Sequence, residues 1–361
     1  MTHEEFMRLA IDMASDLPST VSPNPLVGCV IVKDGQIIGK GRTRPPGGNH
    51  AEIEALFDAA RNGFDPMGST VYVSLEPCPH FGLTPPCTDE LIQAGVSVVV
   101  AGSIDPDPRV SGKGFSQLDN AGVQVISGVL EKEVREINAG FFSRMERGRP
   151  WVRMKIAASL DGRTALGNGQ SQWISSEDSR RDAHLWRART DAMLTGSGTV
   201  WSDDPQLTAR GVEVSSQPRR VILDSRLRTS PRAKVLADDG AWIFCARAEE
   251  EKASDLRANG AEIIVAPNES GMVDLDEVMR ELGKRQINEV LVEAGSILNG
   301  ALLQAGLVDE LLIYLAPSII GSGLPMFALP ELASLNERRL LEFTDVSRVG
   351  KDLRIIARIR N

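Results

Sequence analysis

Short β-rich apolar runs alternate with amphipathic helical segments along almost the whole chain, and no other feature constrains its fold as much. In the first part of the chain the pattern predicts strands at 27–33, 36–39, 70–74, 96–101 and 121–126. It predicts helices at 4–16, 50–62, 88–94 and 130–146. Strands that alternate with helices are typical of a layered sheet. We therefore expect an α/β fold.

A charged, apolar-poor stretch at 144–150 (RMERGRP) interrupts the alternation and is predicted to be a linker. A second α/β series follows, with predicted strands at 151–157, 191–195, 219–224, 241–246, 261–265, 289–293 and 310–316. Its predicted helices lie near 176–189, 273–284 and 296–305. The 361 residues also suit two domains, because one domain usually has about 100–200 residues. We predict domains at 1–146 and 150–361.

The net charge is −9, whereas a general nucleic-acid binder usually carries a basic surface that neutralises phosphates. No apolar run approaches the ~20 residues that span a bilayer, and the acidic first residues do not match a secretory signal. Four cysteines are too few for a disulfide scaffold. We therefore expect a cytoplasmic protein whose partners are neither nucleic acid nor membrane.

Three metal-binding residue types stand next to predicted elements. His50 begins a predicted helix, Cys78 follows a strand, and Cys87 precedes a helix. One imidazole and two thiolates suit zinc, and three protein ligands leave a fourth position for water, as in catalytic zinc sites. Zinc lowers the pKa of bound water to roughly 7. Glu52, two residues after His50, is the candidate catalytic acid/base that moves the water proton.

Non-catalytic interpretations of the same residues stay open. A histidine at a helix start is often a cap or surface residue, and a buried cysteine often only packs. The metal can also be purely structural. Zinc deaminases of nucleobases share H-x-E and P-C-x-x-C, but here eight residues separate Cys78 from Cys87. Cys29 and Cys245 lie inside apolar strands and are predicted to be core residues.

Several motifs, in order, resemble the bifunctional deaminase/reductase family of riboflavin biosynthesis. In the first part they are NPLVGCV at 24–30, HAE at 50–52, EPC at 76–78 and TPPCTD at 84–89. Beyond the linker they are MK at 154–155, SLDGR at 159–163, SQWI at 171–174, DDPQLT at 203–208 and VEAG at 292–295. The long spacing between the cysteines separates this family from cytidine and tRNA adenosine deaminases. The resemblance covers nearly the whole chain.

The resemblance implies a cytidine-deaminase-like three-layer domain followed by a dihydrofolate-reductase-like domain. The implied substrate is 2,5-diamino-6-ribosylaminopyrimidinone 5′-phosphate, whose C2 amino group is replaced by oxygen before NADPH reduces its ribosyl group to ribityl. Zn²⁺ and NADPH are the implied cofactors, and a homo-oligomer is expected. The implied NADPH residues are Ala157, Trp173, Thr199, Asp203, Ser225, Gly295, Ser296, Asn299 and Gly300. The implied substrate residues are Asn24, His80, Ser171, Arg187, Leu207, Arg210 and Glu293.

Two positions depart from the family pattern. Thr43 lies where members often have histidine, and Leu83 where lysine or arginine is common. Arg42 or Arg44 is a candidate replacement for holding the substrate phosphate, because guanidinium binds phosphate with two hydrogen bonds. The Asn24 amide can read a pyrimidine edge, or Asn24 can simply form a turn. The departures leave open a zinc deaminase with another substrate; the acidic charge argues against a nucleic-acid deaminase.

The second part of the chain lacks a Rossmann fingerprint. Residues 290–296 instead predict a strand, a small-residue turn and a helix start, where backbone N–H groups can approach a phosphate. Glu293 ends that strand, at the side of a sheet where α/β proteins bind ligands. Asp161, in an Asp-Gly pair, is either a proton source or a turn residue. No acid or base is assigned to the reduction.

Overall fold

The computed structural model describes residues 1–15, 21–82, 84–214 and 216–360. The chain forms two compact units, Met1–Gly148 and Arg149–Asn361, and each is described by itself. Within the described ranges no helix combines the length and the apolar character needed to cross a membrane.

The first unit is built on a five-stranded sheet in the order β2-β1-β3-β4-β5. Its strands are β1 (Gly28–Lys33), β2 (Gln36–Arg42), β3 (Thr70–Leu75), β4 (Val98–Ser103) and β5 (Gln124–Ile126). Strand β1 pairs antiparallel with β2 and β3, whereas β3, β4 and β5 run parallel. The hairpin turn between β1 and β2 falls at Asp34-Gly35, where both residues have positive φ.

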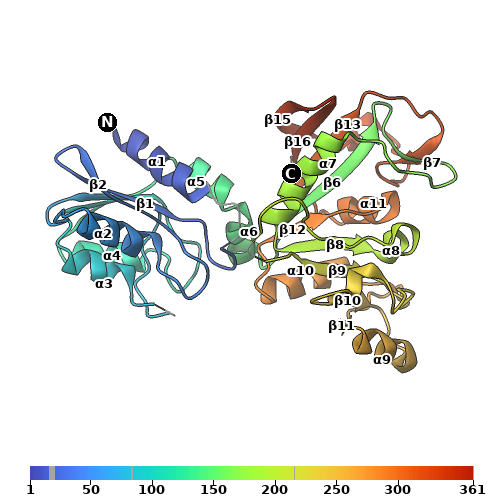
Figure 1. Cartoon of the computed structure of the whole chain (residues 1–361), viewed down its shortest axis with the longest axis horizontal. Coiled ribbons are helices and arrows are strands. Elements are labelled where there is room, and N and C mark those ends of the chain that lie inside the picture. Colours follow the sequence, from blue (N-terminus) through green and yellow to red (C-terminus); the bar gives the residue numbers. More distant parts are fainter. Residues whose placement is uncertain (16–20, 83, 215, 361) are drawn as a thin grey trace. The chain divides into compact units, whose positions relative to one another are not determined.

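Helices cover both faces of this sheet. They are α1 (His3–Ser15), α2 (Ala51–Arg61), α3 (Cys87–Gln93), α4 (Lys113–Asn120), α5 (Glu131–Ile137) and α6 (Ala139–Arg147). Alternate residues of β1 point to opposite faces: Cys29 packs with α2 and α3, and Val30 packs with α1 and α5. Figure 1 shows α1 and α5 on one side of the sheet and α2, α3 and α4 on the other. The predicted three-layer α/β architecture is confirmed.

The helix predicted at 130–146 is two helices, which is a correction with a clear cause. The break falls at Asn138, whose side-chain oxygen accepts the N–H of Leu26 at 2.7 Å while its amide donates to the carbonyl of Leu26 at 2.9 Å. The same amide also donates to the carbonyl of Val134 at 3.3 Å, and a side chain that bonds to the carbonyl four residues earlier competes with the helix for it. Helix α6 also continues through Arg147, into the stretch predicted as a linker.

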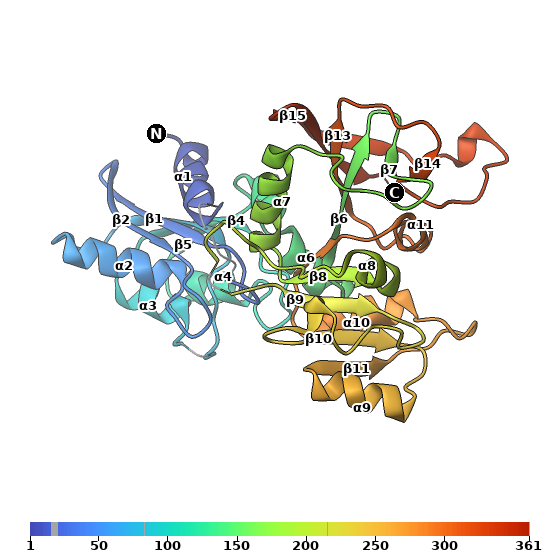
Figure 2. The ribbon, with the colours of Figure 1, turned by 45° about the vertical axis from the view of Figure 1, so that its right-hand side comes forward.

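The second unit contains a nine-stranded mixed sheet in the order β11-β10-β9-β8-β12-β6-β13-β16-β15. These strands are β6 (Trp151–Ser159), β8 (Ala192–Gly196), β9 (Arg219–Leu223), β10 (Ala241–Cys245), β11 (Ala261–Val265), β12 (Glu289–Val292), β13 (Glu310–Ala316), β15 (Leu341–Val349) and β16 (Asp352–Ile359). The strands from β11 to β13 are parallel, and β16 and β15 continue the sheet antiparallel. Figure 2 shows β9, β10 and β11 stacked beside α9.

Helices flank the second sheet as well. They are α7 (Glu177–Arg189), α8 (Ser197–Asp203), α9 (Glu250–Ala258), α10 (Leu275–Lys284) and α11 (Ser296–Gln304). A small separate sheet joins β7 (Arg163–Leu166) and β14 (Gly323–Pro325). The sequence predicted seven of the nine strands of the large sheet but missed β15 and β16. Strand β15 is exposed along most of its length and mixes polar with apolar residues, so it lacks the short apolar run on which the prediction depends.

Candidate functional site

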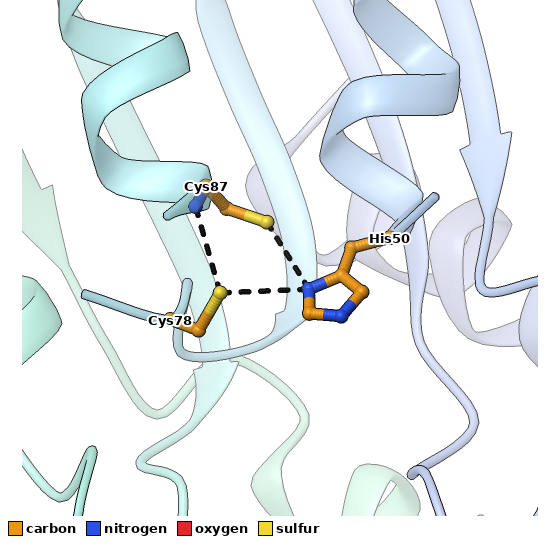
Figure 3. A group of neighbouring side chains, drawn as sticks. All are labelled: His50, Cys78 and Cys87. Atoms are coloured by element: carbon orange, nitrogen blue, oxygen red, sulfur yellow. Dashed lines mark hydrogen bonds between the residues drawn. The ribbon is translucent and has the colours of Figure 1, made fainter. Parts of the chain in front are cut away.

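Three side chains converge in the first unit. Nδ1 of His50 lies 3.5 Å from Sγ of Cys78 and 3.3 Å from Sγ of Cys87. The three ligand atoms all lie within 4.8 Å of one another. Figure 3 shows the imidazole and the two sulfurs turned toward one point between the starts of two helices. The predicted metal ligands are therefore neighbours in space.

Local structure explains the convergence. His50 is the residue before α2 and has extended backbone angles, so its side chain lies at the mouth of that helix. Cys78 follows β3 by three residues, and Cys87 is the first residue of α3. The backbone N–H of Cys87 donates to Sγ of Cys78 at 3.5 Å. A hydrogen bond from the Cys87 thiol lowers the pKa of Cys78, which favours the thiolate that a metal needs.

The spacing of these atoms fits zinc. In a tetrahedral site with Zn–S near 2.3 Å and Zn–N near 2.0–2.1 Å, neighbouring ligand atoms lie about 3.5–3.8 Å apart. The observed N–S distances of 3.3 and 3.5 Å are close to this range. Among the residues that the structure describes, only these three form such a histidine, cysteine or carboxylate group. Three protein ligands leave one coordination position for a reacting molecule.

Glu52 lies beside this group, in the first turn of α2. Its side chain is buried, with 4% of its surface exposed, and it hydrogen-bonds with the Cys87 side chain. Burial raises the pKa of Glu52 to about 7. A carboxyl group with a pKa near neutrality can both accept and release a proton. The arrangement suits general acid/base chemistry on a molecule at the open position.

A second buried carboxylate, Glu76, was not singled out by the sequence. It accepts N–H groups from Asp105 at 3.2 Å, Gly112 at 2.9 Å, Gly114 at 2.9 Å and Phe115 at 3.3 Å. These donors belong to the loop before α4 and to its first turn. Because Glu76 stands two residues before Cys78, it ties the cysteine loop to α4. Its only sequence signal is its place in the EPC motif.

The other residues that the sequence analysis singled out in the first unit differ in burial and in hydrogen bonding. The N–H of Asn24 donates to the carbonyl of Val21, so Asn24 does form a turn. Nδ1 of His80 is buried and has no hydrogen-bond partner among the described residues. Thr43 is buried, and its hydroxyl bonds to the backbone of Val27 instead of facing solvent. Leu83 lies outside the described residues.

Both cationic candidates for the substrate phosphate already interact with other residues of the chain. Arg44 pairs with Glu54 through contacts of 2.6 and 3.0 Å, and about half of its side chain is exposed. Arg42 ends β2 and also has interaction partners. Their role in phosphate binding stays a prediction.

In the second unit Glu293 and Arg187 form a bidentate ion pair. Nε and Nη2 of Arg187 lie 2.7 and 2.9 Å from the two carboxylate oxygens of Glu293. Lys155 adds a longer contact of 3.7 Å. The pKa of Glu293 is held well below its usual range by Arg187 and Lys155, against the effect of burial. Two of the predicted substrate residues are thus in direct contact, and Lys155 joins them.

The remaining predicted substrate residues lie in two segments without regular structure. Leu207 is buried and has a φ of 54°. Arg210 bonds through its guanidinium to Gln206 and Thr208, and the Thr208 carbonyl accepts Nη1 of Arg187 at 3.0 Å. This contact brings 207–210 to the Arg187–Glu293 pair. Ser171 lies in the other segment and is half-buried.

The residues predicted for NADPH line several elements of the same unit. Thr199 and Asp203 lie on α8, Ala157 on β6, and Ser225 after β9, where its hydroxyl accepts the N–H of Val273. Trp173 is 69% exposed, with the guanidinium of Arg180 4.5 Å from its ring centre.

The predicted turn at 295–300 divides into an open and a closed part. Gly295 is exposed and Ser296 is partly exposed at the start of α11. Asn299 is buried and its amide donates to the carbonyls of Ala294 and Met326. A Cβ at Gly300 would lie 2.1 Å from the carbonyl oxygen of Ala328. The first two residues are open to a ligand, whereas the last two hold the backbone together.

Asp161 has the structural role of the two alternatives. Its carboxylate accepts the Ser159 hydroxyl and the N–H groups of Ile320 and Gly321. These hydrogen bonds lower the pKa of Asp161 to about 2, so it carries no proton to donate near neutral pH.

The fold and the site together define a class. A three-layer α/β unit with an imidazole, two thiolates and an adjacent buried carboxyl is the arrangement of a zinc-dependent hydrolytic deaminase. In this chain it is followed by a separate α/β unit with its own polar cluster at strand ends.

Comparison with known proteins identifies the family. Residues 1–103 match the model of the cytidine and deoxycytidylate deaminase zinc-binding region, and 150–355 match that of the RibD C-terminal domain. The chain is 43% identical to the riboflavin biosynthesis protein RibD of Escherichia coli K12, over 98% of both chains. It is 42% identical to the Haemophilus influenzae protein of that name, over 97% of this chain and 95% of the relative.

Solved structures agree. An Acinetobacter baumannii RibD structure matches with a TM-score of 0.90 and 38% identity, over 99% of both chains. A Thermotoga maritima diaminohydroxyphosphoribosylaminopyrimidine deaminase/5-amino-6-(5-phosphoribosylamino)uracil reductase matches with a TM-score of 0.85 and 35% identity, again over 99% of both. The chain belongs to the RibD family of bifunctional deaminase/reductases.

Proposed function

We propose that this chain catalyses two steps of riboflavin biosynthesis. The first unit deaminates 2,5-diamino-6-ribosylamino-4(3H)-pyrimidinone 5′-phosphate at C2, and the second reduces the ribosyl group to ribityl with NADPH. The observation that carries the proposal is the convergence of His50, Cys78 and Cys87 beside the buried Glu52. The RibD relatives, similar over nearly their full length, support both steps.

In the deamination step water adds to the ring carbon C2 and ammonia leaves. A bound zinc ion supplies activation of that water near neutral pH. Glu52 takes a proton from the water and passes it to the ring nitrogen as the hydroxyl adds to C2; it then takes the proton of that hydroxyl and passes it to the departing amine, so that the C2 carbonyl forms as ammonia leaves. The raised pKa of Glu52, about 7, suits both directions of transfer. The products are a ring carbonyl and one ammonia per substrate.

In the reduction step NADPH supplies a hydride, and the protein orients the reacting carbons. The proposed NADPH residues are those on α8, β6 and the start of α11, together with Trp173 and Ser225. Arg187 and Lys155 contact the carboxylate of Glu293, and Arg210 also interacts electrostatically with it, so three cations share one carboxylate. This excess of positive charge suits an anionic group such as the substrate phosphate.

The test of the deaminase is Glu52→Gln, assayed for zinc content and for ammonia release from the diaminopyrimidine phosphate. We expect one zinc per chain to remain while ammonia release falls at least about 100-fold, the usual contribution of a general acid/base. Asp119→Asn, an exposed carboxylate on α4, is the matched control and keeps full activity. Unchanged ammonia release in Glu52→Gln would contradict the catalytic role and leave a structural metal.

Substrate identity needs its own comparison, because Thr43 and Leu83 depart from the family pattern. Ammonia release is measured from the diaminopyrimidine phosphate and from cytidine, with NADPH oxidation followed in the same reaction. We expect ammonia and NADP⁺ from the first substrate only. Release from cytidine alone would end the riboflavin assignment while keeping the zinc chemistry.

We also propose that the chain forms a homo-oligomer through the second unit. β15 is an edge strand, and its side chains together with the preceding segment expose Leu335 (78%) and Phe343 (67%). An exposed apolar edge strand readily pairs with another chain. Phe343→Lys is expected to lower the molar mass measured by light scattering, and an unchanged oligomer would refute this surface.

A further inference from the structure

Segment 207–210 of the second unit has no regular secondary structure, yet its backbone is held at several points by side chains. The Gln217 amide bonds with both backbone groups of Ala209, accepting at 2.8 Å and donating at 3.0 Å. The Thr208 carbonyl accepts Nη1 of Arg187 at 3.0 Å, and the Arg210 N–H donates to Nδ1 of His184 at 3.1 Å. Side chains thus supply the backbone of this segment with the hydrogen bonds that a neighbouring strand would supply in a sheet.

His184 and Arg187 act from the same face of α7. They lie three residues apart on that helix, so their side chains are neighbours. Arg187 also forms the bidentate pair with Glu293, directly after β12. Helix α7 therefore connects the carboxylate at the strand end with the segment that carries Arg210. His184 makes the contact between this helix and Arg210.

The imidazole can make this contact only while it is neutral. Nδ1 accepts a backbone N–H, so it carries no proton and any proton lies on Nε2. Partial burial, with Arg187, Arg210 and Lys155 nearby, lowers the pKa of His184 to about 4, although Glu293 acts in the opposite direction. Near neutral pH the acceptor is therefore available.

We propose that His184 is a positioning residue for substrate binding in the reductase unit: by accepting the backbone N–H of Arg210 it holds that arginine next to the Arg187–Glu293 pair. The inference rests on the proposed function, in which Arg210 contacts the substrate. His184 itself needs no contact with the reacting atoms.

Three substitutions separate this role from others. Asparagine sets a polar amide close to the position of Nδ1, glutamine sets one close to Nε2, and alanine removes both. We expect His184→Ala to raise the KM for the deaminated substrate about fivefold with kcat within about twofold, as for one neutral hydrogen bond. His184→Asn should stay within about twofold of wild type, and His184→Gln should resemble alanine. Leu185→Ala, exposed on the same helix, is the control.

A double-mutant cycle with Arg210→Ala excludes a merely structural effect. If His184 acts through Arg210, then His184→Ala changes KM by less than about twofold in the Arg210→Ala background. A fivefold effect in both backgrounds would overturn the proposal. A fall in kcat at unchanged KM, or rescue by glutamine but not by asparagine, would also overturn it.

Amide hydrogen exchange distinguishes failure of this inference from failure of the proposed function. If the wild-type enzyme does not oxidise NADPH with the deaminated substrate, the proposed function is wrong. Exchange at Arg210 still tests the contact: faster exchange in His184→Ala that returns to the wild-type rate in His184→Asn supports the hydrogen bond from Arg210 to His184. Unchanged exchange at Arg210 in His184→Ala refutes it.

Discussion

Glu76 is the residue whose removal is expected to damage the zinc site most without touching a ligand. Its buried carboxylate accepts four backbone N–H groups, two at 2.9 Å and the others at 3.2 and 3.3 Å. Each hydrogen bond to a charged acceptor is worth about 1.5–3 kcal/mol. Glu76→Gln keeps an oxygen for Gly114 and Phe115 but turns an amide donor toward the N–H groups of Asp105 and Gly112.

Losing those two acceptor contacts is expected to destabilise the first unit by about 2–3 kcal/mol, after partial relaxation and entry of water. Glu76→Ala leaves all four N–H groups without their acceptor and is expected to cost about 3–5 kcal/mol. With a urea m-value near 2 kcal/mol/M, Glu76→Gln moves the midpoint by about 1 M or more. Because Cys78 lies two residues away, zinc should be released over the same transition.

The chain offers an internal control for this experiment. All five tryptophans, at 151, 173, 186, 201 and 242, belong to the second unit, so tryptophan fluorescence reports on that unit alone. Zinc release into a coloured chelator reports on the first. We expect Glu76→Gln to shift zinc release while the fluorescence transition stays in place, and Asp119→Asn to shift neither. Zinc release at the wild-type urea concentration in Glu76→Gln would refute the reasoning.

Three further predictions concern other contacts of the two units. In Gly114→Ala the new Cβ would lie 2.1 Å from the carbonyl oxygen of Pro77, so the cysteine loop must shift and zinc affinity should fall in a chelator competition. Glu293→Gln leaves Arg187 buried without its anionic partner, so the fluorescence-detected unfolding free energy should fall by about 3 kcal/mol and NADPH oxidation should be lost. The pKa of His184 falls from 6.5 unfolded to about 4 folded, so the unfolded state binds the proton first and stability is lost as pH falls from 6.5 to 4. Urea titrations should show a shallower loss over that window in His184→Asn, and equal slopes would contradict it.

The parts of the fold that were predictable depend on local patterns. The pattern of short apolar runs identified β1, β3 and the parallel strands of the second unit, because each is buried on both faces or on one. It failed for β15 and β16, which add to the sheet at its exposed edge. It also missed β7, β14 and the short helices α4, α8 and α9; α4 and α8 start at glycine rather than at a capping side chain.

The chemistry of the zinc site was predictable for a related reason. Histidine and cysteine are rare in this chain, which has four of each, so each stands out at its own position regardless of its distant partners. Cys78 and Cys87 therefore stood out before the structure brought them to 3.5 and 3.3 Å from one imidazole nitrogen. The core assignment of Cys29 and Cys245 succeeded because both lie in apolar strands, and both are fully buried.

The residues that hold the sites in place were not predictable, because their partners are backbone groups far away in the sequence. Glu76 reaches N–H groups 29 to 39 residues further on, His184 reaches one 26 residues away, and Asn138 reaches Leu26 across 112 residues. A backbone N–H has no residue type, so no motif announces it. Sequence motifs therefore indicate the groups that perform chemistry. The polar side chains that hold those groups in position are known only once the fold brings them to their backbone partners. Substitutions at Glu76 and His184 test that division directly, since neither residue is a ligand or a proposed catalyst.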